Sequence, residues 1–138
     1  MGANYMLPLN DLEKAVLRQW LRKADGDLRV AERLADAPED YDAVAFHCQQ
    51  AAEKYLKARI AATGQDPPRT HDLVRLTTIL IRVEMFTSTE IDFAKLLTAF
   101  GVAIRYPGEE DEPPVVELLI AARHFRNRLR PTIAALLI

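Results

Sequence analysis

Four polar residues that could do chemistry recur along one short segment of the chain. They are His47, Gln50, Lys54 and Lys57. Because they are separated by three, four and three positions, they share one face of a helix. An imidazole beside two ammonium groups could hold a phosphate or an acidic group. A solvated or subunit-facing polar stripe has the same periodicity, so both interpretations stay open.

A second candidate lies in the segment Thr70-His71-Asp72-Leu73. Histidine changes its charge near neutral pH, so His71 at the mouth of a cleft could give or take a proton. In the alternative interpretation, Thr70 caps a helix and Asp72 interacts with its positive end. His71 would then be an ordinary residue of the first helical turn.

Arginines provide two further candidate anion sites. Arg105 and Tyr106 stand directly before Pro107-Gly108, and the planar guanidinium of Arg105 suits bidentate contact with phosphate. An arginine in the last turn of a helix also interacts with the negative helix end, which explains its presence equally well. Nearer the C-terminus, three arginines share one helical face and form the best candidate polyanion patch: Arg123, Arg126 and Arg130.

The composition limits what these residues can do. The chain has 138 residues, of which 49% are apolar and 28% charged, as in an ordinary globular domain. Its net charge of −2 predicts neither nucleic-acid nor membrane affinity for the molecule as a whole. Cys48 is the single cysteine, so a disulfide within the chain and a multi-thiolate metal site are excluded. The sequence contains no phosphate-loop, zinc-protease or nucleophile-elbow motif, and we expect no metal and no cofactor.

The ends of the chain carry no membrane signal. The N-terminal residues lack a basic region followed by an apolar stretch. No apolar run approaches the ~18 residues needed to cross a bilayer. The sequence therefore predicts a cytoplasmic protein without a membrane partner.

Five helices are expected to position the candidate residues. Between glycine and proline residues the chain shows helical periodicity, and no alternating apolar and polar run is long enough for a strand. Each expected helix has a recognisable start signal. In chain order, these are Asn10 or Asp11, Asp40, Thr70, the capping box from Thr87 to Glu90, and Pro113-Pro114.

The expected helix ends are equally local. Pro38, Gly64 and Pro107-Gly108 stop the first, second and fourth helices, and the third continues to Ile81. Pro131 is expected to kink or end the last helix. Short connections favour an all-α, up-and-down antiparallel bundle of four to five helices. We expect one domain over residues 1–138, with its core in residues 20–130.

Several segments resemble the HEPN family of prokaryotic helical domains. They are Trp20-x4-Asp25 with Asp27-Leu28, Phe46-His47-x-Gln49-Gln50-Ala51-Ala52-Glu53-Lys54-x-Leu56-Lys57-Ala58, Thr70-His71-Asp72-Leu73 and Ala103-Ile104-Arg105-Tyr106-Pro107. The resemblance implies a bundle of four or five helices that is commonly a homodimer. Such proteins are often encoded beside a minimal nucleotidyltransferase, and many of these pairs act as toxin and antitoxin.

Catalytic members of that family carry an arginine, four to six intervening residues and a histidine, and they cleave RNA without metal. None of the three histidines of this chain has an arginine five to seven positions before it. Arg105 stands where the arginine of the motif is expected, but Pro107-Gly108 and the acidic run that follows occupy the place of the histidine. This pattern resembles the R-Y-P branch of the family and removes most support for a ribonuclease.

The favoured hypothesis is a HEPN protein that binds a nucleotide or a partner within a HEPN and nucleotidyltransferase pair. Its expected site has no catalytic residue and consists of His47, Gln50, Lys54, Lys57, His71, Arg105 and Tyr106. In it, Arg105 and Lys54 would hold phosphate, Tyr106 would stack or form a hydrogen bond, and His71 would orient the ligand. Two alternatives stay open. One is an atypical, metal-independent endoribonuclease toxin that acts on RNA, and the other is a purely structural dimerisation module.

Overall fold

A computed structural model describes residues 8–101, 106–108 and 112–138 of the chain. Over these residues the protein contains five α-helices, one short 3-10 helix and no strand, so the predicted all-α fold is confirmed. The helices are α1 (Asp11–Leu34), η1 (Pro38–Asp40), α2 (Tyr41–Ala62), α3 (Leu73–Ile79), α4 (Ser88–Gly101) and α5 (Val115–Ala135). Among the described helices, none combines the length and apolar character that a bilayer span requires.

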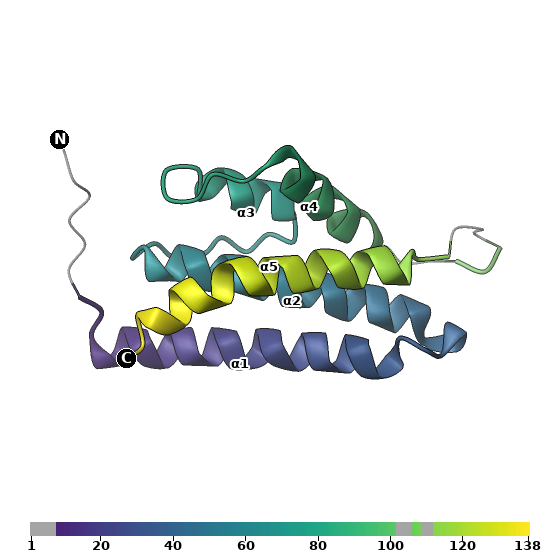
Figure 1. Cartoon of the computed structure of the whole chain (residues 1–138), viewed down its shortest axis with the longest axis horizontal. Coiled ribbons are helices and arrows are strands. Elements are labelled where there is room, and N and C mark those ends of the chain that lie inside the picture. Colours follow the sequence, from purple (N-terminus) through teal and green to yellow (C-terminus); the bar gives the residue numbers. More distant parts are fainter. Residues whose placement is uncertain (1–7, 102–105, 109–111) are drawn as a thin grey trace.

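Helix α2 forms the centre of the bundle. It packs against α1, α3, α4 and α5, and Figure 1 shows α1 on one side of it and the α3–α4 pair on the other. Helices α1 and α2 are antiparallel, and α5 runs antiparallel to α1 (Figure 1). Thirteen of the 22 residues of α2 are buried, many of them alanines that let neighbouring helices approach closely. The helix therefore has no wide solvated face.

Two helices start at capping boxes. The box at Thr87–Glu90 is as predicted, and at the first helix the predicted cap Asn10 is confirmed as part of a box with Glu13. The amide of Glu13 donates to the Asn10 side chain at 2.8 Å, and the amide of Asn10 donates to Glu13 Oε1 at 3.0 Å. At the start of α4, the amide of Thr87 donates to Glu90 Oε1 at 2.8 Å, and the amide of Glu90 donates to Thr87 Oγ1 at 3.1 Å. Each box satisfies two backbone donors that the first helical turn leaves without partners. Gly64 follows α2 with a φ of 88°, as expected of a glycine after a helix end.

Two predicted start signals are wrong. The side chain of Asp40 makes no capping hydrogen bond, because η1 leads directly into α2 and gives Asp40 a φ of −105° and a ψ of 7° instead of an extended conformation. Helix α3 begins at Leu73, and its cap is Asp72, which accepts from the amides of Val74 and Arg75. The predicted cap Thr70 instead accepts a hydrogen bond from the amide of Asp72 at 3.2 Å.

The predicted helix ends also need two corrections. Helix α3 ends at Ile79, two residues before the expected Ile81. Helix α5 continues past Pro131 to Ala135, so an end at Pro131 is wrong, while a kink at Pro131 stays a prediction. A proline removes one hydrogen bond of the helix, but Leu129 and Ile133 on either side are fully buried. Their packing holds the last turn in place. The hydrogen bond that Pro131 removes lies on the exposed side of the helix.

One glycine sets the close approach between α2 and α4. A Cβ added to Gly101 would lie 2.0 Å from Cβ and 2.4 Å from Cγ of Gln49. Both distances are far below van der Waals contact, and the Cβ of Gln49 cannot swing away because it is attached to the backbone of α2. Glycine at this position therefore allows the end of α4 to rest directly on Gln49.

We expect Gly101→Ala to destabilise the protein by on the order of 1–3 kcal/mol, because the two helices must separate to admit the methyl group. Chemical denaturation of the variant measures the change. Gly26→Ala is a matched control in the middle of α1, where an added Cβ would meet only the guanidinium of Arg29 at 3.7 Å. That variant should gain up to about 1 kcal/mol from helix propensity. Equal effects of the two substitutions would contradict the close approach.

Candidate functional site

All three histidines of the chain are held by carboxylates from other segments. The pairs are His47 with Asp27 at 2.9 Å, His71 with Glu53 at 2.7 Å, and His124 with Glu90 at 2.7 Å. In the first two pairs the carboxylate lies against Nδ1, which leaves Nε2 as the ring nitrogen that can meet a ligand. In the third pair it lies against Nε2. Only the first two pairs involve residues of the predicted site.

Asp27 of α1 joins two of the predicted residues. Its Oδ1 lies against His47, and its Oδ2 accepts a hydrogen bond from Lys54. His47 and Lys54 are seven positions apart, which is two helical turns, so one carboxylate between them can reach both. The side chains of His47 and Lys54 are 27% and 21% exposed. This cluster therefore opens to solvent beside Phe46, which is 45% exposed.

Glu53 of α2 organises a second, more deeply buried cluster. It is 4% exposed, and it accepts hydrogen bonds from Gln49 and Lys57, both at 3.1 Å. Gln49 also donates to the backbone oxygen of His71 at 3.0 Å. Since both Gln49 and Glu53 bind His71, they hold the segment that precedes α3 against α2. The His71 side chain is 65% exposed, so a buried network presents one imidazole at the surface.

The remaining predicted residues of α2 complete this network from within. Lys57 is only 8% exposed, and its ammonium is paired with Glu53. Gln50 donates to Gln49 Oε1 at 2.7 Å, which links it to the buried cluster. The charge of each lysine is thus balanced by a carboxylate, Lys54 by Asp27 and Lys57 by Glu53. The lysines fix the carboxylates, and the imidazole of His71 is the most exposed group of the two clusters.

The two remaining residues of the predicted site follow α4. Arg105 lies outside the described residues, so the predicted meeting of its guanidinium with His47 or His71 stays a prediction. Tyr106 is described, and 67% of it is exposed. Gly101, at the end of α4, rests on Gln49. The chain therefore leaves α4 beside the buried cluster that holds His71.

The third carboxylate cluster joins α4 to α5 and lies apart from the predicted residues. Glu90 is 3% exposed and is bound by His124 and Arg128. Burial alone would raise the pKa of Glu90, but hydrogen bonds from the Thr87 amide, Arg128 and His124 outweigh it and lower the pKa to about 2. Arg128 also donates to Glu84 and to the backbone of Met85. Arg128 thus serves the fold, although it belongs to the arginine-rich stretch of α5.

The sequence does not reveal which partner holds each histidine. Asp27 precedes His47 by 20 positions, and Glu53 precedes His71 by 18. The two residues of each pair lie in different segments, so the periodicity of a single helix does not predict that they meet. The pairing of Glu53 with Lys57 is different, because those residues are four positions apart on one helix. Gln49 and Glu53 are also four positions apart, so these two spacings are the signals in the sequence for the buried cluster.

Comparison with known proteins adds family and fold relationships. A family model described as "HEPN domain" matches residues 17–130. The crystal structure of ST0689, an archaeal HEPN homologue, is similar with a TM-score of 0.67 and 22% identity, covering 85% of this chain and 97% of that chain. The crystal structure of TT1696 from Thermus thermophilus is similar with a TM-score of 0.61 and 27% identity, covering 88% of this chain and 94% of that chain. A comparison with curated proteins gave no match.

The Glu90 cluster predicts how stability depends on pH. Its folded pKa of about 2 lies below the ordinary value of 4.5, so its contribution is present above pH 4.5 and is lost as the pH falls toward 2. The contribution lost is on the order of 2–3 kcal/mol for this shift. Urea unfolding of wild type and Glu90→Gln at several pH values measures it. The wild type should be the more stable at neutral pH, and the difference should shrink as the solution is acidified.

Glu117→Gln is the matched control, since it removes an exposed carboxylate from α5. Its unfolding free energy should follow that of the wild type over the same pH range. A Glu90→Gln curve that stays parallel to the wild type down to pH 3 would rule out the stabilising role of Glu90.

Proposed function

Because this chain belongs to the HEPN domain family, we propose that it is a non-nucleolytic member that binds a nucleotide or a partner protein. In this proposal the partner is a minimal nucleotidyltransferase, and the two act as a toxin–antitoxin-like pair in the cytoplasm. Residues 1–138 would form one domain, and the segment Arg105-Tyr106-Pro107 would place it in the R-Y-P branch of the family.

The observation that carries this proposal is the cluster of Gln49, Glu53 and His71. Burying charged and polar side chains inside a helical bundle is costly unless all of them are paired. Here the buried members are paired with one another, and the exposed imidazole of His71 is the part that reaches solvent. A carboxylate that fixes an imidazole through Nδ1 leaves Nε2 oriented toward a ligand. Such an arrangement suits the recognition of a phosphate or a ribose hydroxyl.

A second histidine supports the proposal that a ligand would contact an extended surface and not His71 alone. His47 is fixed by Asp27 in the same manner, on the strip of α2 that its neighbours leave uncovered. Tyr106, which follows α4 in the chain and is 67% exposed, provides an aromatic ring for stacking. Together with Arg105 these groups would hold a nucleotide by its phosphates and its base.

A titration with nucleotides tests the proposal. Trp20 is a suitable fluorescent reporter, because it lies seven positions before Asp27 and therefore on the same flank of α1. Purified protein is titrated with ATP, with GTP and with a short RNA, and thermal unfolding is followed in parallel. Binding should raise the apparent stability by about 2.7 kcal/mol at a hundredfold excess over Kd. We expect Arg105→Ala and His71→Ala to abolish this shift.

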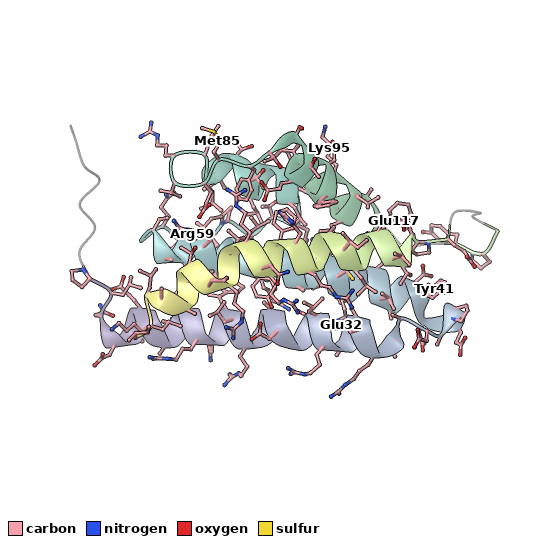
Figure 2. All side chains as sticks on the ribbon, viewed as in Figure 1. Glu32, Tyr41, Arg59, Met85, Lys95 and Glu117 are labelled. Carbon is pink, nitrogen blue, oxygen red and sulfur yellow. The ribbon has the colours of Figure 1, made fainter. Side chains whose placement is uncertain are left out.

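Lys95→Ala is the matched control, since this exposed lysine lies on the outer side of α4 (Figure 2). It should bind as the wild type does. No shift with any nucleotide would overturn nucleotide binding and leave a protein-only interface, for which the nucleotidyltransferase is the next ligand to test. Shortening of the RNA, lost in His71→Ala, would instead establish the atypical endoribonuclease.

We also propose that the protein forms a homodimer through α5. Val116 and Ile120 lie one helical turn apart on the same face and are 67% and 51% exposed. Static light scattering should give the mass of a dimer for the wild type and of a monomer for the double variant Val116→Ser and Ile120→Ser. The double variant Leu12→Ser and Ile81→Ser removes exposed apolar side chains elsewhere and should remain dimeric. A monomeric wild type would refute the proposal.

A further inference from the structure

A row of arginines follows one flank of α1. Its members are Arg18, Arg22, Arg29 and Arg33. The spacings of four, seven and four positions keep all of them within one narrow sector of the helix. At 1.5 Å per residue the row is about 22 Å long. By the same geometry, this sector is about 150° from Asp27, so it lies on the opposite flank of the apolar face of α1.

Helix α5 forms the facing wall with Arg126 and Arg130, which are one turn apart. Two adjoining cavities of about 550 and 340 Å³ lie between α1 and α5, and both are lined by Asp25, Arg29 and Arg130. Figure 2 shows Glu32 of α1 between the two helices, among nitrogen-bearing side chains. We call this trough the arginine groove. It is lined by Arg18, Arg22, Arg29, Arg33, Arg126, Arg130, Asp25 and Glu32.

The arginine groove concentrates positive charge in a chain that is acidic overall. Six guanidinium groups face two carboxylates in its lining, which leaves four positive charges, whereas the whole chain has a net charge of −2. Every basic residue of the lining is arginine, the side chain that binds phosphate in bidentate geometry.

The two carboxylates already occupy the arginines of α5. Asp25 accepts hydrogen bonds from Arg130 at 2.7, 3.0 and 3.2 Å and another from Tyr55. Burial would raise the pKa of Asp25, but these hydrogen bonds outweigh it and lower the pKa, so Asp25 stays ionised and fixes Arg130. Glu32 lies 3.8 Å from Arg126 and 3.4 Å from Arg123. These longer, partly exposed contacts are weak ion pairs.

The arginines of α1 differ in this respect. Within the part of the chain that the structure describes, Arg22, Arg29 and Arg33 form no side-chain hydrogen bond and no close ion pair. The charge of Arg29 still acts on Asp25 and contributes to the lowered pKa of that carboxyl. All three arginines are exposed. A row of like charges along one helix repels itself, and the two carboxylates of the groove leave four of its positive charges unbalanced.

The floor of the groove limits the kind of ligand. Leu28 and Tyr55 are 2% and 0% exposed, so neither of these large side chains can anchor a protein partner at the centre of an interface. No exposed aromatic ring lines the groove on which a base could stack. Packed helices are only about 8–10 Å apart, too close for a nucleic-acid duplex. An extended ligand with regularly spaced charges satisfies all three conditions.

We propose that the arginine groove binds the phosphodiester backbone of a single-stranded nucleic acid. Arg22, Arg29 and Arg33 would contact successive phosphates, with Arg126 released from its weak pair with Glu32. Because the contacts are to phosphates, the groove does not read the base sequence. This site is separate from the surface around His71, and it does not depend on the nucleotide-binding proposal.

Fluorescence anisotropy with labelled single strands of about 12 nucleotides tests the groove at about 50 mM salt. We expect the triple variant Arg22→Gln, Arg29→Gln and Arg33→Gln to bind at least about tenfold more weakly than the wild type. The slope of log affinity against log salt should become shallower by about 2, since about 0.7 is lost for each phosphate contact. RNA and DNA strands of different base composition should bind with similar affinity.

The matched control is the triple variant Arg69→Gln, Arg75→Gln and Arg82→Gln, which removes the same charge from exposed positions around α3. It should retain wild-type affinity, and thermal unfolding should show both triple variants to be folded.

Absence of strand binding by the wild type, or equal weakening in the two variants, would overturn the proposal. An acidic peptide that competes as well as the unlabelled strand would identify a protein ligand instead. ATP that competes as well as the unlabelled strand would show that the site binds the phosphates of a single nucleotide. Either result overturns strand binding. If the groove variant loses strand binding while Arg105→Ala binds the strand as the wild type does, the arginine groove is separate from the surface around His71.

Discussion

Helix α2 is covered by its neighbours on nearly every side, so a polar side chain on it must find a partner inside the protein. Gln49, Glu53 and Lys57 are all buried on this helix, and an unpaired charge there would cost several kcal/mol. The structure meets this constraint by closing them into one network. The network has no buried side-chain nitrogen or oxygen without a partner among the described residues. Its geometry is therefore set by the packing of the whole bundle, and a shift of any helix would disturb it.

The same constraint places the candidate site. His71 does not belong to α2, yet Gln49 and Glu53 hold both its backbone and its ring. Gly101 permits α4 to approach Gln49 closely, so the end of α4 and the start of α3 converge on one stretch of α2. The site is thus built from three segments that the central helix brings together. A binding surface that depends on such packing is rigid, which lowers the entropic cost of ordering it around a ligand.

Helix α1 separates two kinds of polar surface. On one flank, Asp27 lies against His47 and Lys54, so that surface carries oriented hydrogen-bonding groups with little net charge. On the other flank, the arginine row faces α5 with an excess of positive charge. The apolar face of α1, buried against α2, keeps the two apart. One small bundle can therefore offer a compact site for an individual ligand and a long groove for a charged strand.

The sequence by itself determined the all-helical fold, the family, most helix starts and the common face of His47 and Lys54. Each of these depends on residues within one or two turns, where caps, turn residues and apolar periodicity act. Only the tertiary structure decided that Asp27 binds both of those residues and that the helix continues through Pro131. It also decided that the arginines of α1 and α5 line one groove. The physical reason is that contacts between helices depend on how the helices pack, and no local period records which carboxylate or arginine from a distant helix will lie opposite.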